Sequence, residues 1–251
     1  MLSKSKIKFI TQLRQKKYRE LHSMFLVEGS RNIIDFLQSK TTLIDLFATG
    51  NWIGNSQKHI ANFEATVVST NELKKISTLA TPSEALAIFA IPDTTFNGNF
   101  ETDNLTIALD NISDPGNLGT IIRTADWFGI NQIYCSPNTV DAFNPKVVQA
   151  TMGSLARVRI IYADLSKFLT LVQKQLPIFG AVLNGKAITE IAPQTNGIIL
   201  IGSEAHGISN NLLPYISDKI TIPSFNQNIV SHPESLNASI ATAIICYALK
   251  K

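Results

Sequence analysis

The sequence predicts an α/β protein with two domains, and three observations lead to that prediction. Short apolar runs alternate with amphipathic segments along most of the 251 residues, a pattern typical of a mostly parallel sheet covered by helices. Hydrophobic residues make up 45% of the chain and charged residues only 16%, which favours a packed core over disorder. The polar stretch 92-PDTTFNGNFETDN-104 interrupts the alternation. We therefore expect domains at 1–92 and 105–251, joined by a linker at 93–104.

The first domain is expected to mix helices and strands. Short apolar runs predict strands at 25–29, 43–48, 66–69 and 85–91. Amphipathic or capped stretches predict a basic helix over 3–19, a helix from Ser30 to about Gln38, and a short helix from Thr70.

The second domain has stronger apolar runs. They predict strands at 105–109, 133–135, 158–162, 178–183, 198–201 and near Thr221. Helices are expected between them near 117–128, 145–152 and 165–176, and a last helix follows the polar loop after Thr221. Alternation of this kind predicts a mostly parallel sheet with both faces covered.

The charge is unevenly distributed. The net charge is +3, but residues 1–31 hold eight Lys or Arg against Glu20 and Glu28. A basic end on a nearly neutral body suggests an anionic partner such as nucleic acid; the alternative is an ordinary solvated helix face.

Several classes of protein are disfavoured by the sequence. Cys135 and Cys246 lie in apolar runs and look like buried hydrophobic residues, and the four histidines show no metal-ligand spacing. We expect no metal. No signal peptide or membrane span is expected, so the default is a soluble cytoplasmic protein without a membrane partner.

Three stretches look chemically active. The first, 110-DNISDPGNLGTIIRTADWFGI-130, joins a strand to a helix through a turn-forming loop and carries a lone cation, Arg123, among apolar residues. The second, 200-LIGSEAHGIS-209, places Glu204 at the end of a strand, where ligands bind in such sheets. Its alternative is a plain turn before a helix capped by Ser209.

The third stretch is 221-TIPSFNQNIVSHPESLNASIATAIICYAL-249. It places the hydrogen-bonding residues Glu234, Ser235 and Asn237 at a helix start. A single cap needs only one such side chain, so the surplus suggests a ligand contact. Neither a G-x-G-x-x-G nor a G-x-x-x-x-G-K-[ST] motif is present, which disfavours a standard dinucleotide or nucleoside triphosphate site.

Together these three stretches resemble the signature motifs of the SpoU (TrmH) family of RNA ribose 2′-O-methyltransferases, in the family's order. The start, 15-QKKYRELHSMFLVEGSRNI-33, is similar to that family's RNA-substrate-binding domain, a small α/β domain like a ribosomal protein. The resemblance implies a trefoil knot in the second domain, S-adenosylmethionine as cofactor, RNA as substrate and a homodimer formed through the catalytic domain.

The resemblance also assigns residues by motif. Catalytic and RNA-site positions would be Asn117, Arg123, Glu204, Ser235 and Asn237. Cofactor contacts would come from Leu183, Asn184, Gly185, Gly202, Ile222 and Leu236, and RNA contacts from Lys16, Lys17, Arg19 and Arg31. One departure is the long segment between Ile222 and Leu236, where the family has a short loop with Gly; Phe225 or His232 would then take part in binding.

Arg123 raises a chemical question, because a guanidinium is effectively never deprotonated in proteins. We expect it to bind the adjacent phosphate and stabilise a developing alkoxide, with the proton lost to phosphate or water; a general-base role would need special desolvation. Glu204 would pair with Arg123 or fix the loops, and Asn117 would orient Arg123 or the ribose. Ser235 and Asn237 would hold Asn117 or the target nucleotide. The substrate is expected to be 23S rRNA, because the chain has a separate first domain; a tRNA methyltransferase and a non-catalytic RNA-binding relative are the alternatives.

Overall fold

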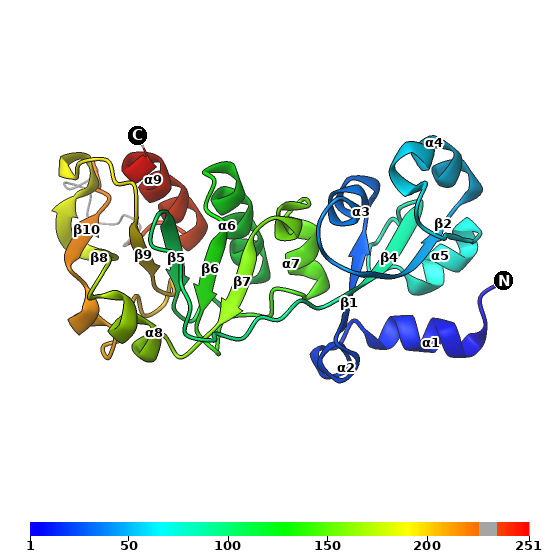
Figure 1. The fold of residues 1–251 in the computed structure, drawn as a ribbon, viewed down its shortest axis with the longest axis horizontal. Helices are drawn as coiled ribbons and strands as arrows, with labels where there is room; N and C mark the ends of the chain where they lie inside the picture. The colour runs from blue at the N-terminus through cyan, green and yellow to red at the C-terminus, as the bar shows by residue number, and fades with distance from the viewer. Residues whose placement is uncertain (226–234, 251) are drawn as a thin grey trace. The chain divides into compact units, whose positions relative to one another are not determined.

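The chain folds into two units. The computed structural model describes residues 1–225 and 235–250. Unit 1 comprises Met1–Asp93 and Asp141–Arg157, and unit 2 comprises Thr94–Val140 and Val158–Lys251 (Figure 1). The chain therefore passes between the units three times. Residues 141–157, which lie within the second domain expected from the sequence, pack with unit 1.

Unit 1 is built on a four-stranded sheet in the order β1-β4-β2-β3. β4 is antiparallel to both β1 and β2, while β2 and β3 are parallel. The strands are β1 (Met24–Glu28), β2 (Leu43–Ala48), β3 (Thr66–Val67) and β4 (Ala85–Ala90). The helices are α1 (Lys4–Gln12), α2 (Lys16–His22), α3 (Ser30–Leu37), α4 (Gly50–Ile60), α5 (Thr70–Ile76) and α7 (Pro145–Ala150).

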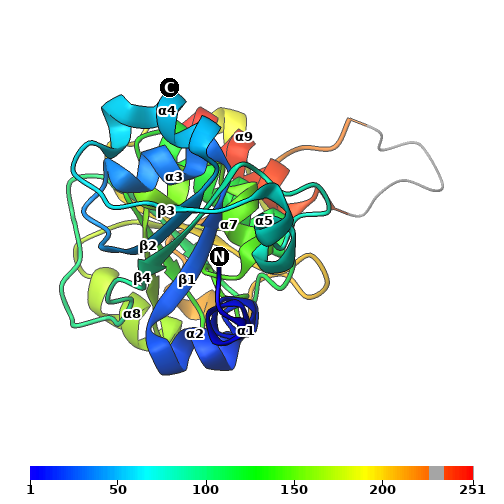
Figure 2. The same cartoon turned by 90° about the vertical axis from the view of Figure 1, so that its right-hand side faces the viewer.

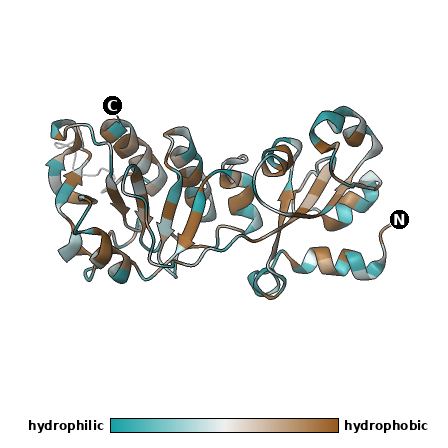
Figure 3. Ribbon diagram, viewed as in Figure 1, coloured by the Kyte–Doolittle hydropathy of each residue, from teal (hydrophilic) through white to brown (hydrophobic). Residues whose placement is uncertain are grey.

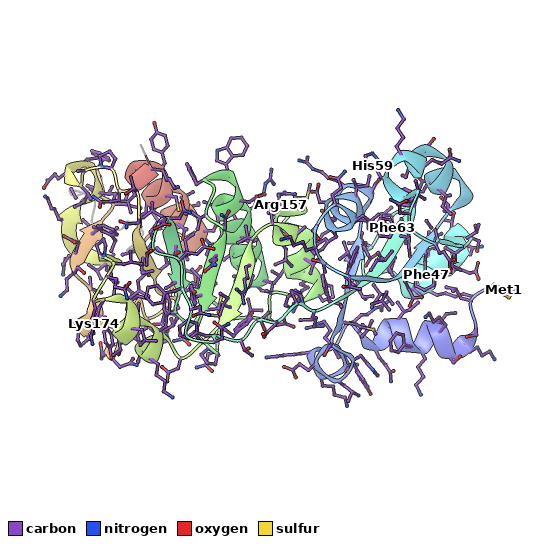
Figure 4. The ribbon with its side chains drawn as sticks, viewed as in Figure 1. Met1, Phe47, His59, Phe63, Arg157 and Lys174 are labelled. Atoms are coloured by element: carbon purple, nitrogen blue, oxygen red, sulfur yellow. The ribbon has the colours of Figure 1, made fainter. Side chains whose placement is uncertain are left out.

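Helices cover both faces of the unit 1 sheet (Figure 2). On one face, Ile10 of α1 and Leu73 of α5 join a buried cluster with strand residues such as Phe47, which is labelled in Figure 4. On the other face, Phe36 of α3 packs against Phe25 and Phe89, with ring centroids 5.4 and 5.1 Å away. Brown, apolar residues are prominent along the strands of this unit in Figure 3, and the helices show bands of brown as well.

Two expectations for unit 1 need correction. The basic helix expected over 3–19 is two helices, α1 and α2, because the chain turns at residues 13–15. The helix expected from a Ser30 cap begins at Ser30 itself, after Gly29 at φ +92°, a backbone conformation that favours glycine. The sequence analysis did not predict α4. Its Thr49 cap accepts a hydrogen bond from Trp52 N at 3.2 Å.

Unit 2 carries a six-stranded sheet in the order β10-β8-β9-β5-β6-β7, with every pair parallel. The strands are β5 (Leu105–Leu109), β6 (Gln132–Cys135), β7 (Arg159–Tyr162), β8 (Ile178–Ala187), β9 (Gly197–Ile201) and β10 (Asp218–Thr221). The helices are α6 (Pro115–Trp127), α8 (Leu165–Val172) and α9 (Ala238–Lys250). α6 and α9 lie side by side on one face, and α8 covers the other (Figure 1). The prediction of an α/β fold with a mostly parallel sheet is confirmed.

Details of unit 2 differ from the expectation. β8 extends to Ala187 because it pairs with two strands in turn: its start pairs with β9, and its end pairs with β10. The helix expected after a Ser209 cap is a short 3-10 turn at Leu213–Tyr215. The expected linker is attached to unit 2, since Phe96 and Phe100 pack against Phe168 with ring centroids at 5.5 and 6.5 Å. No helix in residues 1–225 or 235–250 is long and apolar enough to cross a membrane.

A buried ion pair ties the 141–157 segment into unit 1. Arg19 is 2% exposed, and its guanidinium lies 2.5 Å from the carboxylate of Asp141. The same guanidinium donates to the carbonyl oxygens of Leu13 and Arg14 at 3.0 and 2.8 Å, where α1 ends. Nε, Nη1 and Nη2 of Arg19 therefore each donate a hydrogen bond to a group within unit 1. Removing one partner of such a pair leaves an uncompensated buried charge.

We expect Asp141→Ala to destabilise unit 1 by about 3–5 kcal/mol, because Arg19 would lose its buried counter-ion. Trp52 is 3% exposed within unit 1, so its fluorescence during urea unfolding, in a Trp127→Phe background, reports this unit alone. Glu20→Ala is the matched control, since it breaks the exposed Lys16–Glu20 pair at 3.7 Å, and should cost less than about 1 kcal/mol. Equal losses in the two variants would contradict the assigned role of the buried pair.

Candidate active site

The first motif opens α6 as a capped helix. Asp114 is its N-cap, and the carboxylate accepts a hydrogen bond from Asn117 N at 2.8 Å. Pro115 then occupies the first helical position, where its missing N–H costs nothing. The cap and the proline fix the start of the helix directly after the carboxyl end of β5. As a result the side chain of Asn117 stands at the edge of the sheet where β9 also ends.

The side chain of Asn117 is hydrogen-bonded at both of its polar atoms. Its Nδ2 donates to the Glu204 carboxylate. Its Oδ1 accepts from Asn237 Nδ2 at 2.9 Å. Asn237 thus contacts Asn117, one of the two partners expected for it, and three residues from the three motifs form one connected set. We name Glu204, Asn117 and Asn237 the amide–carboxylate chain.

Asn237 also begins the last helix. Its Oδ1 accepts from Ser239 N at 3.0 Å and Ser239 Oγ at 2.7 Å, so it caps α9 while its Nδ2 reaches Asn117. Ser235 lies two residues earlier and is exposed. Glu234 and His232, which the sequence analysis also noted, lie outside the described residues.

Glu204 stands at the tip of a tight hairpin. Ser203 and Gly207 exchange two backbone hydrogen bonds of 3.1 and 2.8 Å, and Gly207 adopts φ +66°. The hairpin folds back closely on Gly202, where an added Cβ would lie 2.1 Å from the Gly207 carbonyl carbon. A glycine at 202 is therefore required by this close backbone approach.

Arg123 lies two helical turns after the start of α6. Its side chain is exposed and lines a shallow hollow with Thr120, Thr124, Trp127, Phe128 and Ala243. Of the two roles expected for Glu204, pairing with Arg123 is not observed: within residues 1–225 and 235–250 no carboxylate forms an ion pair with Arg123, and Glu204 binds Asn117 at the start of α6 instead. The charge is tolerated because it faces away from the core.

Among the expected cofactor residues, Leu183, Asn184 and Gly185 lie within β8, and Gly202 and Ile222 directly follow β9 and β10. Thr221 Oγ1 donates to the Leu183 carbonyl at 3.0 Å, which brings the β8 segment beside Ile222. The pairing of β8 with β10 shifts in register between Lys219 and Ile220. Leu183 is 69% exposed and Leu236 46% exposed, so apolar side chains are available to cover a flat ligand. Asn184 is exposed as well, whereas Phe225 is almost fully solvated.

Glycine is required at position 185 for a structural reason that is independent of any ligand. An added Cβ there would lie 2.6 Å from the Ile220 carbonyl carbon, so β10 can approach β8 only because residue 185 is glycine. Among the described residues, no group of three or more His, Cys, Asp or Glu could hold a metal ion.

The expected RNA contacts divide into two kinds. Lys16, Lys17 and Arg31 are exposed. Arg19 is not available to RNA, because it is buried and paired with Asp141. Sequence reasoning counted Arg19 among the surface charges because its neighbours on α2 are solvated.

Sequence reasoning also missed part of the basic surface of unit 1. α5 packs beside α1 and brings two further lysines to it. The exposed cations of these two helices and the turn after α1, which we name the α1–α5 ridge, are Lys4, Lys8, Arg14, Lys74 and Lys75. The nearby Glu72 is held in the α5 capping box, and the backbone N–H of Ser69 lowers its pKa to about 2. Lys4 and Lys74 are 70 residues apart in the sequence, so a local run of charge could not reveal that α1 and α5 lie together.

An exposed apolar face runs along α6 and α9. Its members are Trp127 at 85% exposed, Ile240 at 53%, Ile244 at 36% and Tyr247 at 62%. Large apolar side chains gathered on two adjacent helices are unusual for the free surface of a monomer and mark an interaction site.

Comparison with known proteins assigns both parts of the chain. Residues 104–247 match the model described as the SpoU rRNA Methylase family. Residues 4–87 match the model described as an MRM3-like substrate binding domain. The 23S rRNA (guanosine(2553)-2′-O)-methyltransferase RlmP of Bacillus subtilis is 26% identical over 247 residues, covering 98% of this chain and 96% of that protein.

Solved structures agree over the whole chain. A structure from Porphyromonas gingivalis, assigned to the TrmH family of RNA methyltransferases, is 36% identical with a TM-score of 0.84 and covers 100% of this chain and 98% of that one. An AdoMet-bound rRNA methyltransferase from Sinorhizobium meliloti is 26% identical with a TM-score of 0.86 and covers 99% and 96%.

Proposed function

The chain belongs to the SpoU rRNA Methylase family, and from that premise we propose that it transfers the methyl group of S-adenosylmethionine to a ribose 2′-hydroxyl of 23S rRNA. The observation that carries the proposal is the amide–carboxylate chain, in which one residue from each of the three motifs meets at the carboxyl edge of the parallel sheet. The RlmP relative acts on 23S rRNA by its name, which favours rRNA over tRNA as substrate.

The residues within β8, after β9 and β10, and before α9 have the chemistry needed to hold S-adenosylmethionine. Exposed Leu183 and Leu236 offer apolar cover for an adenine ring. The backbone at Gly202 and Ile222 lies at the carboxyl ends of β9 and β10, where ligands bind in parallel sheets. We assign Leu183, Asn184, Gly185, Gly202, Ile222 and Leu236 to this site. When bound, the cofactor supplies an electrophilic methyl group on a sulfonium.

The protein's own part in the reaction is positioning and charge stabilisation. A guanidinium does not lose its proton under ordinary conditions, so we assign Arg123 to a phosphate of the target nucleotide and to the oxyanion that develops at the 2′-hydroxyl. The 2′-hydroxyl oxygen bonds to the methyl carbon as the carbon–sulfur bond breaks, and the hydroxyl proton passes to the phosphate or to water. The amide–carboxylate chain fixes the loops around it, and Ser235 is left to contact the nucleotide. Holding reactants in line accounts for roughly 7–11 kcal/mol in well-oriented systems, which makes positioning the main contribution we assign.

The trefoil knot remains a proposal, supported by family membership. So does a cytoplasmic location, supported by the bacterial relative.

Methyl transfer from labelled S-adenosylmethionine to RNA that lacks the modification, followed by digestion to nucleosides, tests the function. We expect one new 2′-O-methylnucleoside in 23S rRNA. Arg123→Ala should lower the rate by about 100-fold or more, because an oxyanion-stabilising group is lost, while cofactor binding measured by calorimetry stays unchanged. Arg159→Ala removes an exposed arginine of β7 in the same unit and should leave the rate unchanged. Label in tRNA alone would reject the substrate, and bound cofactor without label in any RNA would reject the enzyme.

We further propose that unit 1 binds the RNA substrate through the α1–α5 ridge together with Lys16, Lys17 and Arg31. Charge is the support for this assignment. The ridge gathers five exposed cations, while neighbouring acidic groups are already engaged: Asp45 pairs with Lys6 at 2.8 Å and Glu72 caps α5. Lysines and arginines in such a cluster neutralise phosphates and release counter-ions.

Replacing Lys74 and Lys75 by alanine should weaken binding to transcribed 23S rRNA and reduce the slope of log K against log salt by up to about 2, one for each lost phosphate contact. The matched control is the pair Lys40→Ala and Lys58→Ala, which removes the same charge from other exposed positions of unit 1. An equal change in the control would mean that net charge, rather than the ridge, governs binding.

We also propose that two copies associate through the apolar face of α6 and α9. Burial of Trp127, Ile240, Ile244 and Tyr247 would remove apolar surface from water at about 25 cal/mol per Å². Isologous pairing of one patch with itself is the commonest arrangement in homodimers.

Ile244→Asp combined with Tyr247→Asp should convert a dimer into a monomer, because charges would be placed in a dry interface. Light scattering coupled to gel filtration measures the mass directly. Leu171→Asp, at a residue 46% exposed on α8, should leave the dimer intact. A wild-type chain that runs as a monomer at micromolar concentration would reject the proposal.

A further inference from the structure

Asp110 and Asn111 directly follow β5 and precede the Asp114 loop, and the proposed chemistry gives them no role. Asp110 is 3% exposed. No Lys, Arg or His of the described chain forms an ion pair with it. A buried carboxylate without a cation is costly unless hydrogen bonds compensate it, so its hydrogen bonds need an explanation.

Both oxygens of Asp110 are used. Oδ1 accepts from Asn111 Nδ2 at 2.8 Å, and Oδ2 accepts from the backbone N–H of Ser209 at 2.7 Å. Asn111 adopts φ +59°, a left-handed conformation that asparagine tolerates better than most residues. In this conformation its Nδ2 also reaches Ser209 Oγ at 3.3 Å, and its backbone N–H donates to Ser136 Oγ at 2.9 Å.

These bonds fasten the hairpin that carries Glu204. Ser209 follows the 203–207 hairpin by two residues, with the buried Ile208 between them. The limb at residues 207–209 is therefore held at two points: the Ser209 N–H bonds to Asp110, and the backbone of Gly207 and Ile208 approaches Gly202 closely. Nothing else among the described hydrogen bonds joins the Ser209 N–H to the sheet.

We infer that Asp110 is a positioning residue, which acts through the Ser209 N–H and the 203–207 hairpin to place the Glu204 carboxylate against Asn117. This inference rests on the proposed function, because it assigns Asp110 to the same site. It makes the β5 end the anchor for the hairpin.

The position requires two acceptor atoms. With Asp110→Asn, one side-chain atom becomes an NH₂ group that faces either the Ser209 N–H or the Asn111 NH₂, and both are donors. The double variant Asp110→Asn/Asn111→Asp restores complementarity, since the new amide at 110 can accept from Ser209 and donate to the new carboxylate at 111. Aspartate also tolerates positive φ. The swap therefore separates the hydrogen-bond pattern from the mere presence of a charge.

We expect Asp110→Asn to lower kcat for methyl transfer by about 10- to 100-fold, the cost of a small misplacement in an active site. Hydrogen exchange should speed up in residues 202–209, where the Ser209 N–H has lost its acceptor. The double variant Asp110→Asn/Asn111→Asp should recover most of the activity and the protection. In a Glu204→Gln background, Asp110→Asn should reduce kcat little further, because both changes disturb the same contact.

Asp164→Asn provides the matched control. It makes the same chemical change at the α8 N-cap of the same unit, where asparagine also caps well, and should leave kcat and exchange unchanged. A normal kcat in Asp110→Asn, additive losses with Glu204→Gln, or no recovery in the swap would overturn the inference. An inactive wild-type protein would instead reject the proposed function, and the exchange measurement would still decide whether Asp110 fastens the hairpin.

Discussion

The hydrogen-bonded side chain of Asn117 is the constraint on which the rest of the site depends. An amide is asymmetric: one end can only donate and the other only accept. The carboxylate of Glu204 accepts from Nδ2, and this fixes Oδ1 toward the Nδ2 of Asn237. The orientation of Asn237 then directs its own Oδ1 into the first turn of α9. The Glu204 carboxylate on the hairpin thus sets the orientation of the side-chain amides of Asn117 and Asn237. These hydrogen bonds connect α6, the start of α9 and the hairpin that follows β9.

The alternation of apolar runs and amphipathic segments was sufficient to predict the parallel sheet. That residues of the three motifs share one site was implied only by the family resemblance. The structure gives the geometric reason, since β5 and β9 run parallel and their motifs follow them at the same edge of the sheet. The environment of Arg123 could not be predicted in the same way. Helical periodicity places it between the buried Ile122 and the half-buried Thr124, and only the packing of α6 against α9 decides which side is solvated. The pairing of β8 with both β9 and β10 could not be predicted either, because a register shift leaves no periodic pattern in the sequence.

In unit 1, the sequence did not reveal which basic residues are exposed. A run of basic residues on one helix looks like a single charged surface, yet Arg19 is turned inward to Asp141, 122 residues away in the chain. Exposed positive charge beside α1 comes instead from Lys74 and Lys75 of α5, which no local pattern connects with α1. Long-range partners of this kind also mean that residues 1–93 do not contain everything that unit 1 needs. A chain cut after Asp93 would keep the guanidinium of Arg19 buried and remove its counter-ion, so unit 1 depends for its folding on a segment inserted between β6 and β7.

The exposure of Arg123 connects chemistry with association. In water a guanidinium on a helix surface interacts weakly with a phosphate, because the solvent screens the attraction. The hollow around Arg123 is lined by Trp127, Phe128 and Ala243, so covering the apolar face of α6 and α9 would also lower the dielectric constant around the guanidinium. An anionic phosphate or alkoxide would then be stabilised more strongly at the same distance. In the proposed homodimer, the surface that holds the two copies together is also the surface that strengthens the charge of Arg123, and activity is expected to depend on dimerisation for that reason.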